Sequence, residues 1–291
     1  MQDHEPTIRS RELGEGLHRA MKDAKLNQKS AAQKLGWSQS RVSRLLSGKR
    51  GGSEVDVSAF LAIVQVTGAE RDRLLGICRE QNTPGWLQQH GARLPQQLRT
   101  LIDHEDKAVT YSDVQTIVVP GLLQTAEYAH ALISRVVNVP TEEVNDRVAA
   151  RLGRQNLFTR AHPAKFTFYL HEAALRLPVG GPEVIAEQLR HLLHKATRPY
   201  LKLRVIPVSH GAHAALAGPF TFMEFAEFRP VVYLESETSC VFLEKPEQIT
   251  AYRRILRELA KTALSEEESR ELIATLATEL AADREDHHDR A

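Results

Sequence analysis

The stretch Gln28–Leu46, QKSAAQKLGWSQSRVSRLL, decides how the start of this chain folds. Its first part places small and apolar residues at the spacing of one helical face, namely Ala31, Ala32 and Leu35. Gly36 follows, where a chain that leaves a helix often needs a positive φ, and Ser38 is a natural N-cap for a second helix. The stretch therefore predicts two short helices, 28–35 and 39–46, joined by a tight turn.

The second helix has one apolar face and several polar ones. Val42, Leu45 and Leu46 point inward, while glutamine, serine and arginine side chains occupy the rest. Two helices can cross closely at the small Ala32, with Val42 and Leu45 filling the angle between them. This geometry is typical of a helix-turn-helix, whose second helix enters the DNA major groove. An ordinary helical hairpin with a polar surface is the alternative that spacing alone leaves open.

The exposed face of the second helix has suitable chemistry for base edges, because glutamine can pair with adenine and arginine with guanine. The loop that follows, 47–52, carries Lys49 and Arg50, which are well placed to touch phosphates. A flexible basic linker is the alternative explanation of that loop.

Charge is unevenly distributed along the chain of 291 residues. Residues 7–51 carry eleven Lys/Arg and three Asp/Glu, whereas residues 52–291 carry 27 basic and 32 acidic residues. A basic segment on a mildly acidic protein favours a polyanionic partner through counterion release. With 42% hydrophobic residues the chain can bury a core, and its length favours two domains.

Several classes of function are disfavoured. Cys78 and Cys240 lie far apart without a CxxC motif, which argues against a disulfide framework or a zinc site and predicts two core thiols. No apolar run reaches membrane length, and the first residues lack a signal-peptide core, so we expect a cytoplasmic protein. No GxGxxG, P-loop, GxSxG or HExxH motif appears, and we predict no catalytic residues, no cofactor and no metal.

The coarse pattern predicts an all-α domain over 1–82, an α+β domain over 83–284 and a charged tail over 285–291. Helices are expected at 11–25, 28–35, 39–46, 56–66 and 69–81, and then at 94–105, 121–134, 141–159 with Thr141 as its cap, 183–196, 248–264 and 266–282. Strands are expected at 108–119, 165–172, 201–208, 220–225, 231–235 and 240–243. Strands and helices mix without a regular βαβ repeat, which favours an α+β class.

The segment LNQKSAAQKLGWSQSRVSRLLSGK resembles the lambda-repressor-like helix-turn-helix of the Xre family. The match is carried, at the family's spacing, by Gln28, Ala32, Gly36, Ser38, Val42, Leu45 and Gly48. The resemblance implies that Gln39, Ser40 and Arg44 face base edges, and that Gln28 and its neighbour Lys29 bind phosphate. To these we add Ser43 as a base contact and Arg41 as a phosphate contact.

The second half resembles the C-terminal domain of actinobacterial WhiJ-like helix-turn-helix regulators. The resemblance is carried by Val119–Ala129, Arg151–Gln155, His171–Arg176 and, in the same order, by Gly180-Gly181-Pro182, Gln188-Leu189, Val205-Ile206-Pro207 and Pro219-Phe220. It implies a regulator whose N-terminal half binds DNA and whose C-terminal half has no settled biochemical role. Members often accompany small proteins encoded nearby, which suggests a protein partner, and the resemblance implies little about what is sensed.

Three features of the second half leave alternatives open. Arg147, Arg151 and Arg154 share a helix face, either as a salt-bridged surface or as a surface for a partner or an anion. His210 and His213 suggest a metal pair that no nearby Cys or carboxylate completes. Gly180-Gly181-Pro182 before a helix forms either a turn or an anion cradle.

Together these features predict a sequence-specific DNA-binding transcriptional regulator that acts as a homodimer on a pseudo-palindromic operator. One helix of eight residues offers few base contacts, so two heads, with half-sites about one turn apart, are needed. The second domain either senses a small molecule or docks a partner protein. The alternative is an antitoxin-like interaction module whose DNA binding is only autoregulatory.

Overall fold

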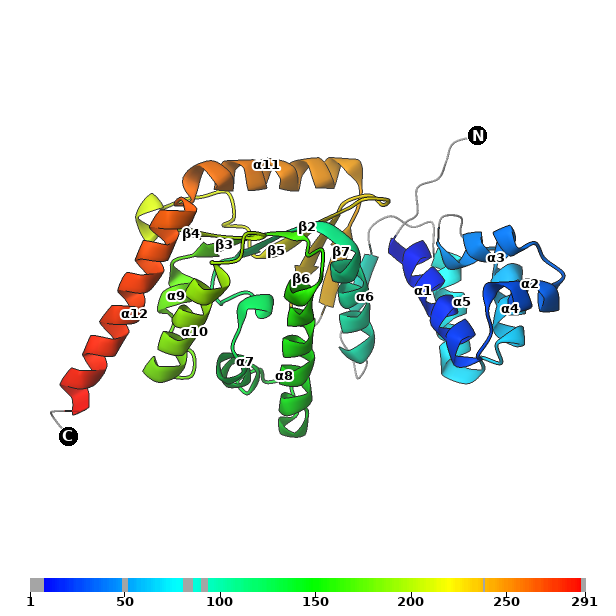
Figure 1. Ribbon diagram of the computed structural model, residues 1–291, viewed down its shortest axis with the longest axis horizontal. Coiled ribbons are helices and arrows are strands. Elements are labelled where there is room, and N and C mark those ends of the chain that lie inside the picture. Colours follow the sequence, from blue (N-terminus) through cyan, green and yellow to red (C-terminus); the bar gives the residue numbers. More distant parts are fainter. Residues whose placement is uncertain (1–7, 49–51, 81–85, 90–93, 238, 289–291) are drawn as a thin grey trace. The chain divides into compact units, whose positions relative to one another are not determined.

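The computed structural model describes residues 8–48, 52–80, 86–89, 94–237 and 239–288. The chain divides into two compact units, which are described separately. Unit 1 comprises Met1–Thr100, Phe225–Val232 and Ser236–Ile249, and unit 2 comprises Leu101–Glu224, Tyr233–Glu235 and Thr250–Ala291. The expected fold class is confirmed, because a helical N-terminal segment precedes an α+β portion (Figure 1). The predicted domain boundary at 82/83 lies outside the described residues.

The helical segment of unit 1 consists of α1 (Ile8–Asp23), α2 (Gln28–Leu35), α3 (Gln39–Leu46), α4 (Glu54–Ile63) and α5 (Gly68–Glu80). Its core is drawn from the apolar faces of these helices, and it includes Leu13, Leu17, Ala31, Val42, Phe60, Leu61 and Leu74. Cys78 lies in the same core, as predicted, and its thiol donates to the Gly52 carbonyl oxygen at 3.3 Å.

The turn between α2 and α3 is built as the sequence predicts. Gly36 adopts φ 65°, in the left-handed region that favours glycine. The Ser38 hydroxyl accepts a hydrogen bond from the Arg41 N–H, which caps α3. Asn27 and Ser30 form a reciprocal capping box at the start of α2. Each cap satisfies donors that a helix start would otherwise leave unpaired.

One residue of α1 is held by aromatic rings of the same unit. The Arg11 guanidinium carbon lies 4.9 Å from the ring centroids of both Phe225 and Phe228. Arg11 is buried, and its pKa is lowered to about 10 because burial disfavours the charged form, a cost that nearby Glu244 partly offsets.

The strands form a seven-stranded sheet with the order β1-β7-β6-β5-β2-β3-β4. Their bounds are β1 (Trp86–Gln89), β2 (Ala108–Gln115), β3 (Lys165–His171), β4 (Leu201–Ile206), β5 (Phe220–Phe225), β6 (Val231–Glu235) and β7 (Ser239–Leu243). In unit 1, β1 pairs antiparallel with β7. In unit 2, β3 pairs parallel with both β2 and β4, with Tyr111 opposite Phe166 and Phe168 opposite Leu203.

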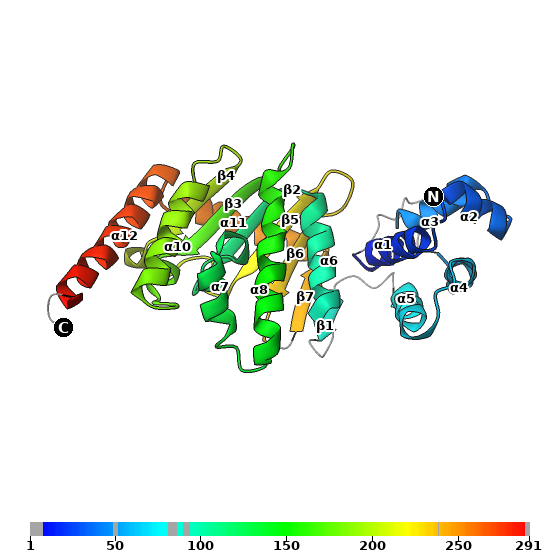
Figure 2. The ribbon, with the colours of Figure 1, turned by 60° about the horizontal axis from the view of Figure 1, so that its bottom comes forward.

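The remaining helices flank these strands. They are α6 (Leu94–Lys107), η1 (Gly121–Leu123), α7 (Ala126–Ile133), η2 (Thr141–Glu143), α8 (Val144–Gly153), η3 (Arg154–Thr159), α9 (Ala173–Arg176), α10 (Pro182–Lys195), η4 (Val208–His210), α11 (Pro246–Thr262) and α12 (Glu266–His288). Within unit 2, helices α7, α8 and α10 cover one face of strands β2–β4, and α11 crosses the opposite face (Figures 1 and 2). The rings of Phe220 and Tyr252 meet on that opposite face, with centroids 4.8 Å apart.

Several elements differ from the prediction: α9 and η4 were not expected, the strand expected over 108–119 ends four residues early as β2, and four further differences have clear physical reasons. β1 was not expected, because four residues offer too short a pattern and antiparallel pairing with β7 decides their conformation. The helix expected over 141–159 is three short pieces, η2, α8 and η3, and Thr141 starts the first of them instead of capping it. The helix expected over 121–134 is divided by Thr125, which caps α7. α12 continues to His288, six residues beyond its expected end and into the predicted tail.

Candidate nucleic-acid interface

The outer face of α3 is a continuous polar surface. Val42, Leu45 and Leu46 are buried, whereas the predicted base-contacting residues are all exposed, namely Gln39, Ser40, Ser43 and Arg44. Since burial of one face fixes the rotation of a helix about its axis, these four side chains are presented together. The helix thus has the form that major-groove reading requires.

Arg44 is oriented from within its own helix. Its Nε donates to the Ser40 carbonyl oxygen at 3.2 Å, one turn earlier. Among the described residues it has no carboxylate partner. The outer edge of the guanidinium is therefore available to a guanine or a phosphate.

Arg41 is held by two groups that the sequence pattern does not connect with it. Its guanidinium carbon lies 4.2 Å from the Trp37 ring centroid, and its Nη2 is 2.8 Å from Asp56 Oδ1. Trp37 lies in the turn just before the Ser38 N-cap of α3, so helical spacing alone does not predict the stacking. Asp56 comes from α4, so only the fold reveals that pair. Half of the Arg41 side chain stays exposed, at 49%.

The predicted phosphate contacts lie at different places. Lys29 is exposed in the first turn of α2, and Gln28 beside it is half-buried. Lys49 and Arg50 lie outside the described residues. The first turn of α2 is where contacts to the DNA backbone are predicted. Lys29 lies in that turn, so its ammonium can reach a phosphate.

The three arginines predicted as a partner or anion surface in unit 2 lie in three environments. Arg147 pairs with Glu143 one turn away, at 2.8 Å. Arg151 donates to Gln124 Oε1 at 2.9 Å, and Arg154 makes an ion pair with fully buried Glu105. The structure thus departs from the expected shared surface, because the helix ends at Gly153 and η3 turns Arg154 inward.

The Arg154 ion pair belongs to a buried polar network. The Tyr111 hydroxyl donates to Glu105 at 3.2 Å and lies 3.4 Å from Asp113, which also accepts from the Gln115 amide at 2.8 Å. Burial raises the pKa of Asp113 to about 7, although Gln115, Arg154 and Tyr111 oppose that shift. Asp113 is therefore a buried carboxyl that titrates near neutrality.

Two histidines far apart in the sequence meet where His171, at the end of β3, faces His213 in the loop after β4. The rings of His171 and His213 stack with centroids 5.2 Å apart. Their Nδ1 atoms accept hydrogen bonds from the Ala173 and Ala215 backbone N–H groups, each at 3.2 Å. Burial lowers the pKa of His213, and His171 and His210 lower it further. Parallel stacked rings do not converge on one ion, and no group of three or more metal-ligating side chains occurs among the described residues.

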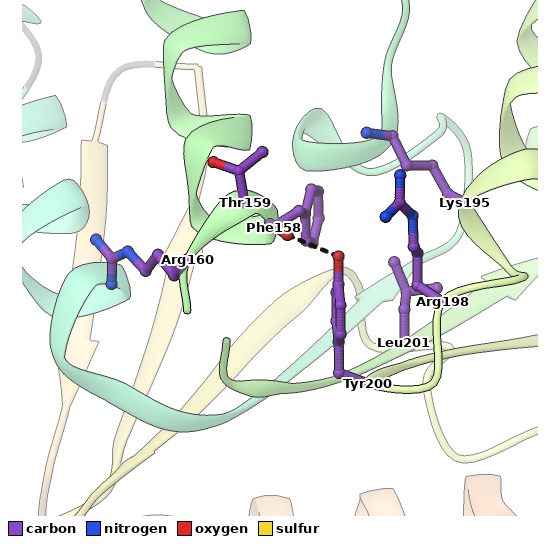
Figure 3. A pocket seen from close by; sticks show the side chains of 7 residues that line it. All are labelled: Phe158, Thr159, Arg160, Lys195, Arg198, Tyr200 and Leu201. Atoms are coloured by element: carbon purple, nitrogen blue, oxygen red, sulfur yellow. Dashed lines mark hydrogen bonds between the residues drawn. The ribbon is translucent and has the colours of Figure 1, made fainter. Parts of the chain in front are cut away.

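A cavity of about 380 Å³ lies in unit 2, where η3, the end of α10 and the start of β4 meet. Its lining combines aromatic and basic side chains, namely Phe158, Thr159, Arg160, Lys195, Arg198, Tyr200 and Leu201 (Figure 3). The sequence pattern gives no sign of this cavity, because its lining comes from two distant segments, 158–160 and 195–201. No helix within the described ranges is long and apolar enough to cross a membrane.

Comparison with known proteins assigns both parts of the chain. Residues 12–74 match the model of a helix-turn-helix domain, and residues 98–275 match a domain of unknown function, DUF5753. No curated protein matches the chain.

One similar solved structure is described as "Structure of TrmBL2, an archaeal chromatin protein, shows a novel mode of DNA binding". It is 12% identical, with a TM-score of 0.30, over 68% of this chain and 60% of that one. This chain thus spans less than two thirds of that protein, and a superposition of this quality establishes neither a shared fold nor a shared function. The match over residues 98–275 covers more than half of the sequence, and the chain belongs to the DUF5753 family, with a helix-turn-helix domain ahead of the family's domain.

Proposed function

We propose that this protein is a sequence-specific transcriptional regulator of the Xre type, whose helix α3 reads the major groove. The observation that carries the proposal is the outer face of α3, where Gln39, Ser43 and Arg44 are exposed together above a fully buried apolar face. A helix-turn-helix domain supports DNA as the partner. The polar face supplies both the amide and the guanidinium that pair with adenine and guanine.

The proposed regulator acts as a homodimer on a pseudo-palindromic operator, since the α3 helix of one head spans few base pairs. Its DUF5753 domain senses a small molecule or docks a small partner protein of the kind found with WhiJ-like regulators. No catalytic step is part of the proposal.

The test is a salt titration of full-length protein on DNA from the region upstream of its own coding sequence, with Arg44→Ala alongside. We expect tight binding to one segment, a loss of affinity in the variant, and a dimer in sedimentation on that segment. Weak binding that is blind to sequence and unaffected by Arg44→Ala would refute the reading role of α3. A monomer both free and on DNA would refute the homodimer.

A further inference from the structure

The cavity in unit 2 has an excess of positive charge on its rim. Lys195 ends α10, Arg198 follows in the turn after it, and Arg160 contributes from the end of η3. Arg160 is neutralised, because it pairs with the Asp106 carboxylate and donates to its backbone carbonyl oxygen at 2.6 Å. Lys195 and Arg198 have no ion-pair partner in the described part of the chain, and none of the lining residues is acidic. Two uncompensated cations thus face one hollow.

Helix electrostatics explains only part of this arrangement. Cations in the last turn of a helix are stabilised by the carbonyl end of the helix dipole, which accounts for Lys195. Arg198 lies beyond that turn, and it is close enough to act on Lys195. Burial lowers the pKa of the Lys195 ammonium, and repulsion from Arg198 lowers it further. The two charges therefore oppose each other in the absence of an anion.

Two aromatic side chains, Phe158 and Tyr200, contribute to the lining of the cavity. The Phe158 ring packs edge-on against Phe166, with centroids 4.8 Å apart, and the Lys195 ammonium lies 5.1 Å from the centroid of the same Phe158 ring. The Tyr200 hydroxyl donates to the Phe158 carbonyl oxygen at 2.7 Å, which ties η3 to the start of β4. Figure 3 shows Phe158 and Tyr200 between Arg160 on one side and Lys195 with Arg198 on the other. An apolar group in the cavity can therefore contact aromatic side chains beside the two cations.

We propose that this cavity binds a small organic anion, in which one acidic group pairs with Lys195 and Arg198 and a flat apolar portion packs on Phe158. The volume of about 380 Å³ is at the lower end of the range for small-molecule sites. Guanidinium and ammonium groups recognise carboxylates, sulfonates and phosphate esters alike, so the shared chemistry is an acidic group on an apolar frame. If the DUF5753 domain senses a small molecule, as one form of the proposed function holds, this site defines the chemical class of that ligand. The biological role of the site rests on that proposed function.

The test uses full-length protein and the fluorescent arylsulfonate 8-anilinonaphthalene-1-sulfonate. We expect saturable binding of one molecule per chain. The affinity should fall about tenfold or more in Lys195→Gln and in Arg198→Gln, since each variant removes one charge from the acidic group. Arg190→Gln is the matched control: it removes an exposed arginine from the same helix, one that pairs with Glu187 at 2.8 Å outside the cavity, and it should change the affinity less than about twofold.

Competition identifies the ligand class. Benzoate should displace the probe, whereas inorganic phosphate at the same concentration should not, because it lacks the apolar part. The double variant Lys195→Gln/Arg198→Gln, checked for wild-type thermal unfolding, should neither bind the probe nor respond to benzoate.

Probe binding that survives in the folded double variant would overturn the proposal, as would displacement by phosphate as effective as by benzoate. DNA binding measured on the same preparations separates the two proposals. Anion binding without DNA binding would refute only the regulator, and DNA binding without anion binding would refute only the cavity's role.

Discussion

Arg154 and Glu105 form a two-point ion pair inside unit 2, with Arg154 Nη2 2.6 Å from Glu105 Oε1 and Nε 2.9 Å from Oε2. The Glu105 side chain is 0% exposed and the Arg154 side chain 13%. Two parallel hydrogen bonds between the guanidinium and the carboxylate offset the cost of removing both charges from water. The pair joins α6 to η3, and the Tyr111 hydroxyl on β2 adds a further hydrogen bond to it.

Removal of one partner should destabilise the chain strongly. In Arg154→Met the Glu105 carboxylate stays buried without its counter-charge, and we expect the free energy of unfolding to fall by about 3–5 kcal/mol. Urea denaturation followed by circular dichroism measures this loss. The control is Arg147→Met on the preceding helix α8, which breaks the more exposed pair with Glu143 and should cost less than about 1 kcal/mol. Equal losses in the two variants would contradict the interior role of Arg154.

Asp113 should make stability depend on pH. Its pKa is raised to about 7 in the folded chain, above the value of a free carboxyl, so the folded state binds a proton more tightly than the unfolded state. Tighter binding of this proton stabilises the folded state. The resulting contribution to the free energy of unfolding is fully present below about pH 4 and is lost as the pH rises through about 7. Asp113→Asn, which cannot ionise, should therefore gain stability relative to wild type at pH 8, on the order of 1–3 kcal/mol. That gain should shrink towards pH 4.5 in urea denaturation. A difference between the two proteins that does not vary with pH would show that Asp113 does not titrate in this range.

The local signals in the sequence were sufficient for the helix-turn-helix and for most strands. Gly36, Ser38 and the apolar spacing of Val42 and Leu45 act within one or two turns, so the pattern carries them without tertiary information. β5 and β6 begin and end where predicted, because alternating apolar residues reflect burial of a strand face directly.

The parts that the sequence did not reveal depend on contacts between distant segments. Helical spacing put Arg154 on a surface with Arg147, but the chain turns at Gly153, and the buried Glu105 draws Arg154 inward. His171 and His213 come together only because the end of β3 faces the loop after β4. Patterns in a single sequence do not encode contacts between distant segments. The cavity beside Phe158 was not predicted for the same reason, because distant segments line it.

The pairing of Arg41 with Asp56 should limit the affinity for DNA. Asp56→Asn removes the carboxylate and leaves Arg41 on the Trp37 ring, so Arg41 would carry an uncompensated charge towards a phosphate. We expect DNA of any sequence to bind about two- to fivefold more tightly at low salt, with a steeper salt dependence. Fluorescence anisotropy on an arbitrary duplex at several salt concentrations measures both effects.

Glu54→Gln is the matched control for Asp56→Asn. Glu54 also lies in the first turn of α4, so its loss has a similar effect on the helix dipole, but it pairs with Arg79 on α5. If the two variants bind DNA equally, Arg41 does not contact phosphate.

Arg44 and Lys29 should differ in how they contribute to DNA binding. Arg44→Ala removes a guanidinium oriented along α3 by the Ser40 carbonyl, and it should cost about 1–3 kcal/mol on the cognate site while relaxing the preference at one base position. Lys29→Ala removes an exposed charge at the start of α2, and it should weaken all sequences alike and lower the slope of log affinity against log salt by about one. Both variants are measured on a panel of duplexes in which each operator position is changed in turn. Because a base contact depends on sequence and a phosphate contact on salt, identical profiles for the two variants would show that α3 does not read bases through Arg44.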